Sequence, residues 1–210
     1  MKFIENTKSY FGKLAIRKYI KSHKRSMTSC NIDEAKTIGI LFNATNPGNF
    51  EVIKEFVSSF SNKKSSIDVM GFVDDKQLID QYLYRKGFEF FTRNQLNWYY
   101  KPNIPSVEDF IKKPFDLLLD LTLDNPFPIR YITMCSVAKF KAGRYYTDYD
   151  YLDLMIDIEK EMKSQPLNDN PSEVNKKEKS LKQADINYST EIQLNFLITQ
   201  LLHYLSLLKK

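Results

Sequence analysis

The sequence predicts one α/β domain on a single doubly wound, mostly parallel sheet of five to six strands, with a Rossmann-like layout. Short segments rich in β-formers alternate with segments of helical apolar spacing along the middle of the chain. One segment, "FDLLLDL" from Phe115 to Leu121, is almost continuously apolar, which is typical of a central parallel strand covered on both faces. With 210 residues, 42% of them hydrophobic, the chain is long enough to bury one sizeable core.

Three strands are expected in the first half of the domain. Thr37–Phe42 is a short apolar strand, followed by an Asn-, Pro- and Gly-rich loop and a helix over Asn49–Phe60. Residues 65–75 contain the second strand, and residues 76–87 have helical spacing closed by a glycine suited to a helix end. The third strand is "FEFFT", residues 88–92. This order indicates two strand-to-helix units in succession.

The second half continues the alternation after a loop with two prolines. A helix capped by Ser106 precedes the apolar strand described above, and a second helix follows it, beginning near Pro126. Asp124 or Asn125 is the expected cap of that second helix. The remaining segments are a strand within residues 141–147 and a sixth strand, or the start of a helix, within residues 152–159.

The chain divides into four regions. Residues 1–30 form a basic amphipathic helix, and residues 31–160 form the α/β domain. Residues 161–187 contain few hydrophobic residues, which predicts a solvated linker or insertion. Residues 188–210 form a C-terminal helix, capped by Ser189 or Thr190, that docks on the sheet. Its wide apolar surface also allows a homodimer contact.

The positive charge is concentrated at the N-terminus. Residues 1–26 hold eight lysine or arginine residues and one acidic residue, a charge of +7, so of the net +5 the rest of the chain carries −2. Three interpretations are open for this segment: a solvated face, contact with nucleic acid or an acidic protein surface, and attachment to an anionic membrane surface. The residues expected to contact a partner are Lys13, Arg17, Lys18, Lys21, Lys24 and Arg25.

A second candidate site lies at the carboxyl ends of the strands. The right-handed crossover rule places every strand-to-helix turn at the same edge of a parallel sheet, and ligands bind there. The residues expected to line this crevice are Asn43, Asn46, Gly48, Asp74, Asp120, Thr122 and Asp124. The first turn, "NATNPGN", lacks the three glycines of a dinucleotide-binding loop, and its asparagines also suit local turn capping. Asp120 and Asp124 therefore form either a site or a helix cap.

A third feature is "LNWYYKP", which holds the only tryptophan, Trp98. Its aromatic residues and Lys101 suit stacking on a base or sugar, and they suit equally the covering of a sheet edge.

The sequence lacks the residue patterns that metal binding and nucleophilic catalysis require. Cys30 and Cys135 are far apart and do not form a metal-binding motif, so we expect reduced thiols. His23 and His203 lie away from the strand ends, and no nucleophile motif is present. We therefore assign no catalytic residue, metal or cofactor, and leave open whether the chain is an enzyme. A cytoplasmic location is expected because neither a signal peptide nor a run of 18 apolar residues is found.

Four segments carry a resemblance to a known group: "ILFNATNPGNFEVIKEFV", "LNWYYKP", "FDLLLDLT" and "SVAKFKAGRY". Together they resemble an uncharacterised family of cytoplasmic proteins from Bacteroidota, which implies no catalytic residue. The stretch from Phe115 to Arg144 is also weakly similar to the N-terminal half of heptosyltransferase-type glycosyltransferases, but the nucleotide-sugar half of that group is missing. The sequence therefore favours a non-catalytic interaction module that binds an acidic partner, such as RNA or a ribosome, through its N-terminal helix. The alternatives are a small enzyme or ligand-binding domain that uses the crevice, and peripheral membrane attachment.

Overall fold

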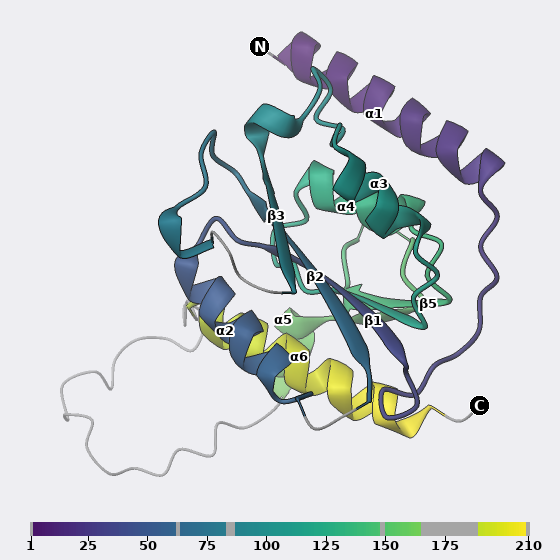
Figure 1. Ribbon diagram of the computed structural model, residues 1–210, viewed down its shortest axis with the longest axis vertical. Helices are drawn as coiled ribbons and strands as arrows, with labels where there is room; N and C mark the ends of the chain where they lie inside the picture. The colour runs from purple at the N-terminus through teal and green to yellow at the C-terminus, as the bar shows by residue number, and fades with distance from the viewer. Residues whose placement is uncertain (1, 62–63, 83–86, 148–149, 165–188, 209–210) are drawn as a thin grey trace.

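The computed structural model describes residues 2–61, 64–82, 87–147, 150–164 and 189–208 (Figure 1). They form a six-stranded sheet in the order β3-β2-β1-β4-β5-β6, and every neighbouring pair is parallel. The strands are β1 (Thr37–Asn43), β2 (Ser66–Val73), β3 (Phe88–Thr92), β4 (Leu117–Asp120), β5 (Phe140–Arg144) and β6 (Leu154–Ile156). The predicted α/β fold class is confirmed.

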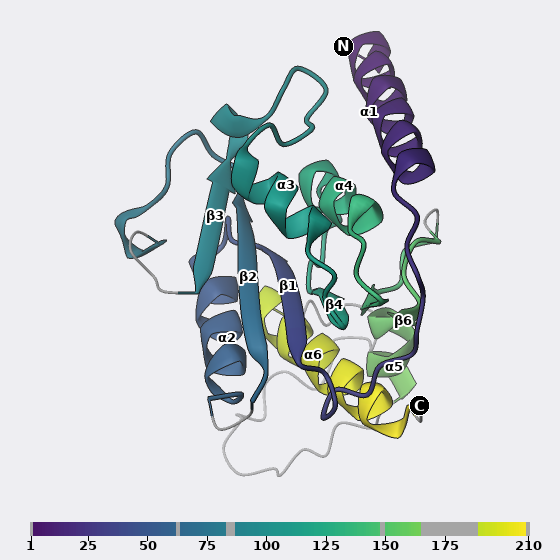
Figure 2. The same cartoon turned by 45° about the vertical axis from the view of Figure 1, so that its right-hand side comes forward.

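Helices cover both faces of this sheet (Figure 2). On the first face, α2 (Pro47–Ser58) and α6 (Thr190–Leu207) pack against each other, and α5 (Ile158–Ser164) contacts α6. On the second face lie α3 (Pro105–Lys112) and α4 (Phe127–Cys135). Because helices cover both faces, the sheet is doubly wound and has two apolar cores.

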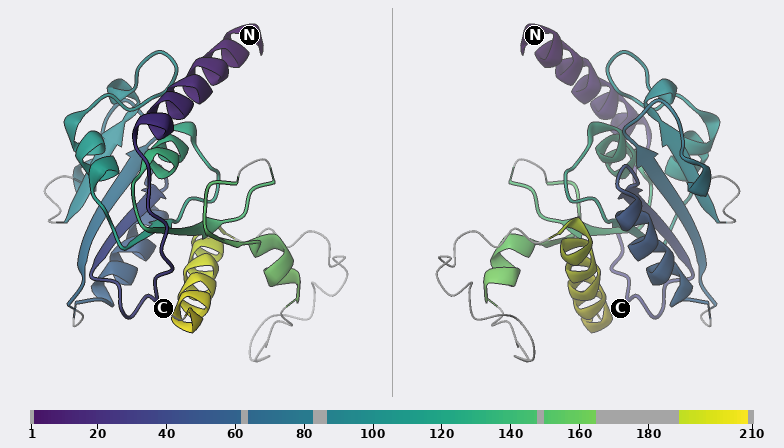
Figure 3. Two further views of the ribbon diagram at one scale, coloured as in Figure 1. Left: turned by 90° about the vertical axis from the view of Figure 1, so that its right-hand side faces the viewer. Right: turned by 90° about the vertical axis from the view of Figure 1, so that its left-hand side faces the viewer.

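The N-terminal helix α1 (Lys2–Ser22) forms an additional outer layer. It lies over α4 on the second face, and its N-terminal end projects away from the sheet (Figure 3). Within the described part of the chain, no helix is long and apolar enough to cross a membrane.

The central strands are buried on both sides, as the apolar runs predicted. All four residues of β4 are buried, with Leu117 and Leu119 in the core of the first face and Leu118 in the core of the second. Gly39 of β1 makes room for this packing, because a Cβ there would lie 2.9 Å from the ring of Phe115. The polar residue Asp120 ends the strand and faces the second layer of helices, where Thr133 of α4 contacts it.

One helix prediction needs correction. In the described part of residues 76–87, only Asp80–Tyr82 form a helical turn, of the 3-10 type, so the predicted helix is wrong there. The aromatic ring of Tyr82 is buried against Phe90, and its hydroxyl donates to the Ala44 carbonyl at 2.6 Å, so tertiary contacts hold this segment in place of a helix.

The predicted cap of α3 also differs from the structure. Ser106 lies inside α3, which begins at Pro105 and has Ile104 at its N-cap position. At α6, by contrast, the predicted cap is confirmed, since the Ser189 hydroxyl accepts a hydrogen bond from the Ile192 amide. Of the predicted linker over residues 161–187, residues 165–187 lie outside the described part of the chain.

Candidate functional site

The strand order changes direction between β1 and β4, which are neighbours in the sheet. In doubly wound sheets, ligands bind beside such a switch point, outside the carboxyl ends of the strands. β1 ends at Asn43 and β4 ends at Asp120, and Thr122 and Asp124 follow in the next turn. The fold therefore brings these four predicted residues to one edge of the sheet.

Asn43 joins the turns that follow the two central strands. Its side-chain amide donates to a carboxylate oxygen of Asp124 at 2.7 Å, and its side-chain oxygen accepts from the Thr45 amide at 2.9 Å. The backbone carbonyl of Asn43 accepts from the Asn49 side chain at 3.2 Å. These bonds use the polar groups of Asn43 to fix the two turns to each other.

Asn46 and Gly48 lie at the N-terminus of α2, where exposed backbone amides favour an anion. The Asn46 side chain caps the helix, since its oxygen accepts from the Gly48 amide at 2.9 Å. Its amide group donates to the carboxylate of Glu191, at the start of α6, at 3.0 Å. That carboxylate lies so close to Gly48 that an added Cβ would be 2.1 Å from its oxygen. A carboxylate of the chain itself thus occupies this helix end.

Asp74 follows β2 and lies farther along the same edge. Both of its carboxylate oxygens accept hydrogen bonds from the guanidinium of Arg93, which follows β3, and the Asp74 amide donates to the Thr45 hydroxyl at 2.8 Å. Both side chains of the ion pair are about half exposed, so this contact adds little to stability.

Asp120 is buried, with an exposed fraction of 2%. Its carboxylate accepts from the Thr122 hydroxyl at 2.6 Å, the Thr122 amide at 3.2 Å and the Thr133 hydroxyl of α4 at 2.7 Å. Burial raises the pKa of Asp120, and the hydrogen bonds from the two threonines oppose that shift. In this arrangement Asp120 anchors the β4 turn and α4 to each other.

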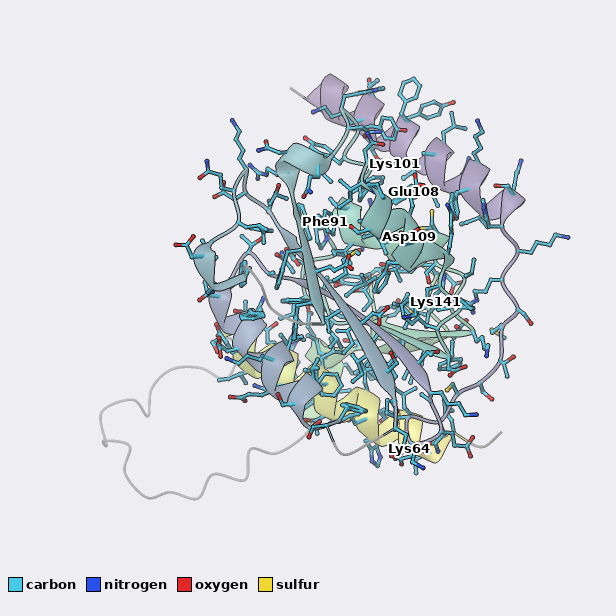
Figure 4. The ribbon with its side chains drawn as sticks, in the orientation of Figure 1. Lys64, Phe91, Lys101, Glu108, Asp109 and Lys141 are labelled. Atoms are coloured by element: carbon cyan, nitrogen blue, oxygen red, sulfur yellow. The ribbon has the colours of Figure 1, made fainter. Side chains whose placement is uncertain are left out.

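A second buried ionisable residue, Lys141 of β5, lies in the interior of the same layer (Figure 4). Its ammonium group donates to the Thr133 carbonyl at 2.7 Å and to the Met134 carbonyl at 3.4 Å. These carbonyls belong to the last turn of α4, which has no intrahelical donors for them. Burial lowers the pKa of Lys141 to about 7, with a smaller contribution from the charge of Arg25. Sequence reasoning missed this residue, because an isolated lysine in a strand pattern gives no sign that it is buried.

The predicted caps of α4 are wrong. Pro126 holds the N-cap position of α4, and no side chain makes a capping hydrogen bond there. The Asp124 carboxylate instead accepts from Asn43, as described above. Asn125 has a positive φ of 49°, and its side chain accepts from the Tyr151 hydroxyl at 3.0 Å.

Three surface cavities lie away from this edge. One lies between α3 and the edge of β2 and β3, one beside β6 and α6, and one near Asp116 at the start of β4. None of the three is lined by a strand-end candidate residue. The strand-end residues bind one another and neighbouring residues of the chain, which favours a role in fixing the turns.

The second candidate region is α1, which docks on the domain by one face. Ile16 is buried, and Ala15 and Tyr19 pack beside it against the core of the second face. Gly12 lies against the ring of Phe127 at the start of α4. The apolar and small residues of α1 are thus partly used to hold the helix on α4.

The opposite side of α1, together with the segment that follows the helix, carries the predicted basic residues. The side chains of Lys13, Arg17, Lys18, Lys21 and Lys24 are exposed, and none of them is bonded to a described residue. Lys13, Arg17 and Lys21 are spaced by four residues, so they form one row along the helix. Arg25 differs from the others, because it is half-buried and forms an ion pair with Asp153. The structure therefore brings five of the six basic residues to the solvent.

A group of exposed aromatic residues adjoins this basic row. Phe11 of α1 contacts both Tyr10 and Trp98, with ring centroids 5.6 Å and 5.1 Å apart. The Lys8 ammonium donates to the Tyr100 hydroxyl at 3.2 Å and lies over the ring of Tyr100. Sequence reasoning singled out Trp98 but did not connect it with α1, because nothing in a single sequence indicates which loop a helix will touch.

In a comparison with protein families, residues 8–170, most of the chain, match a family of unknown function, DUF6913. The matched segment runs from α1 through α5 and so includes the basic row, the aromatic group and the sheet. Neither the curated proteins nor the solved structures contain a match to the chain.

Proposed function

The chain belongs to this family of unknown function, and we propose that it is a non-catalytic interaction module that binds RNA through the outward face of α1. The observation that carries the proposal is the row formed by Lys13, Arg17 and Lys21, with Lys18 beside it on α1 and Lys24 just after the helix. These side chains are exposed and are not paired with any described acidic residue. A cationic row of this kind suits a partner that carries negative charges at regular intervals, as a phosphate backbone does.

The charge distribution supports an electrostatic role for α1. The N-terminal segment carries +7 while the rest of the chain carries −2, so the attraction for a polyanion is confined to one element. The projection of α1 beyond the sheet leaves room for an extended partner beside it (Figure 3).

The docking of α1 favours RNA over a membrane surface. A helix that lies in a membrane interface buries a whole apolar face in lipid. Here Ile16, Ala15 and Tyr19 contact the domain, and the C-terminal half of the outward face is chiefly cationic. Binding to phosphates needs only the cations, and these are exposed.

The test is the affinity for a fluorescein-labelled single-stranded RNA at low salt, measured by anisotropy. The variant Lys13→Gln/Arg17→Gln/Lys21→Gln removes the row. Its matched control, Lys36→Gln/Lys76→Gln/Lys160→Gln, removes the same charge from exposed positions elsewhere on the domain. We expect the first variant to bind at least about tenfold more weakly than the control, because it loses three phosphate contacts. Equal affinities of the two variants, or no binding by the wild type, would contradict the proposal. Binding to vesicles of anionic lipid without binding to RNA would also contradict it.

A further inference from the structure

We propose that the exposed aromatic residues beside α1 stack on unpaired bases, so that the RNA bound by this protein is single-stranded. The inference rests on the proposed function and adds the class of RNA. It concerns one surface, the aromatic platform, which consists of Tyr10, Phe11, Trp98 and Tyr100.

The rings of the aromatic platform are exposed although they contact one another. Tyr10 is 64% exposed, Trp98 56% and Tyr100 45%. Phe11 lies between Tyr10 and Trp98, with its ring edge-on to both, and so connects α1 to the loop that follows β3. Large exposed aromatic side chains grouped in this way are typical of a binding surface.

The loop that carries Trp98 and Tyr100 is a tight turn held by one side chain. The side-chain oxygen of Asn97 accepts from the amides of Tyr99 and Lys101, at 3.1 Å and 2.9 Å. The backbone of Asn97 also pairs with that of Lys101, at 2.9 Å, and Leu96 and Pro102 form a bridge at the base of the turn. The rings are therefore presented by an ordered turn, which reduces the entropy lost when a base stacks on them.

The backbone of Tyr100 adds a second indication. Its φ is 67°, in the left-handed region that favours glycine and is strained for a residue with a large side chain. In this conformation the ring of Tyr100 lies under the Lys8 ammonium group, and the distance from the ring centroid to Nζ is 4.5 Å. Strained positions of this kind are common at ligand contacts.

Cations flank the platform and continue from it. Lys8 borders Tyr100, and Lys13 begins the basic row one turn beyond Tyr10 on the same helix. A strand laid along α1 would stack its bases on the platform at one end and place its phosphates on the row. Aromatic rings beside a cationic groove are the usual means of binding single strands without sequence preference.

An RNA duplex does not fit this platform. Its bases are already paired and stacked, and its deep, narrow major groove excludes side chains. A duplex would reach only the cations of α1, through its phosphates. The platform therefore favours unpaired RNA over an RNA duplex.

The fluorescence of Trp98 tests the inference directly, because the chain has one tryptophan. The probes are oligouridine, an RNA duplex of similar length and vesicles of anionic lipid. We expect oligouridine to quench Trp98 and the duplex to leave its emission unchanged. We expect Tyr100→Ala to bind oligouridine about 5- to 150-fold more weakly, with duplex affinity unchanged. The control Tyr145→Ala removes another exposed tyrosine and should match the wild type.

Two failures are distinguishable. Salt-dependent binding of oligouridine and duplex with equal affinity, no quenching and no effect of Tyr100→Ala would overturn this inference and leave the proposed function intact. Absence of binding to either RNA would overturn both. A blue shift of Trp98 emission with lipid vesicles, without any response to oligouridine, would also overturn both in favour of a membrane surface.

Discussion

Gly12 of α1 lies directly against the ring of Phe127 at the start of α4: a Cβ at this glycine would be 2.4 Å from the Phe127 Cζ atom. Alanine in the interior of a helix is ordinarily favoured over glycine by about 1 kcal/mol. Here the missing side chain is what allows α1 to approach α4. The contact fixes which face of α1 is buried and which carries its cations to the solvent.

Gly12→Val is therefore expected to release α1 from α4. Overpacking at such a contact costs about 1–3 kcal/mol, and an undocked helix of this length is only marginally stable in water. Trypsin should then cleave within α1 faster than in the wild type, on the order of tenfold, as followed by limited proteolysis and mass spectrometry. Leu14→Val, on the exposed side of the helix, is the control and should leave the cleavage rate nearly unchanged. An unchanged rate in Gly12→Val would mean that Phe127 does not hold α1.

Thr133 links the two buried ionisable residues of the second face, since its hydroxyl donates to Asp120 and its carbonyl accepts from Lys141. We expect Thr133→Val to lower the free energy of unfolding by about 1–3 kcal/mol, because it removes a donor from a buried carboxylate. Thr133→Ser keeps the hydroxyl, so its free energy of unfolding should fall clearly less. Urea denaturation measures both. A larger loss in Thr133→Ser, which lacks the methyl group that valine keeps, than in Thr133→Val would show that the methyl group matters more than the hydrogen bond.

Because Lys141 is buried, we expect the stability of the protein to depend on pH in a specific way. Its pKa is about 7 in the folded chain, against an ordinary value of 10.5. Between these values the unfolded chain binds more protons than the folded chain at this residue, so its contribution to stability rises with pH. This contribution is fully present above pH 10.5 and is lost as pH falls through about 7.

Lys141→Met removes this linkage. Relative to the wild type, the variant should lose more stability at pH 10 than at pH 6, with a difference of at most about 1.4 kcal/mol per pH unit across the window. The measurement is the urea midpoint of both proteins across this pH range. A constant difference between them would show that Lys141 titrates as an ordinary lysine.

The strands of the sheet could be predicted from the sequence because their apolar runs are local and continuous. β1, β3, β4 and β5 lie where those runs are, and the alternation with helices gave the correct class of fold. The helix predicted over residues 76–87 is wrong in the described part of that segment, because Tyr82 makes its contacts with Ala44 and Phe90 in place of a regular helix. Such long-range contacts leave no local pattern.

The candidate surfaces were predictable only in part. The basic residues of α1 can be counted in the sequence, but which side of the helix docks depends on Phe127, far along the chain. The contact between Phe11 and Trp98 is equally remote. At the strand ends, the residue types were predicted, whereas the carboxylate of Glu191 at α2 was not, because α6 follows a long intervening segment.

The most direct measurement of the central claim is the salt dependence of RNA binding. The logarithm of the association constant for a single-stranded RNA should be measured against the logarithm of salt concentration, for the wild type and for Lys13→Gln/Arg17→Gln/Lys21→Gln. If the outward face of α1 binds the phosphates, the slope should become shallower by about 2 in the variant, since each contact with a single strand contributes about 0.7. Identical slopes for the two proteins would contradict the assignment of RNA binding to this face of α1.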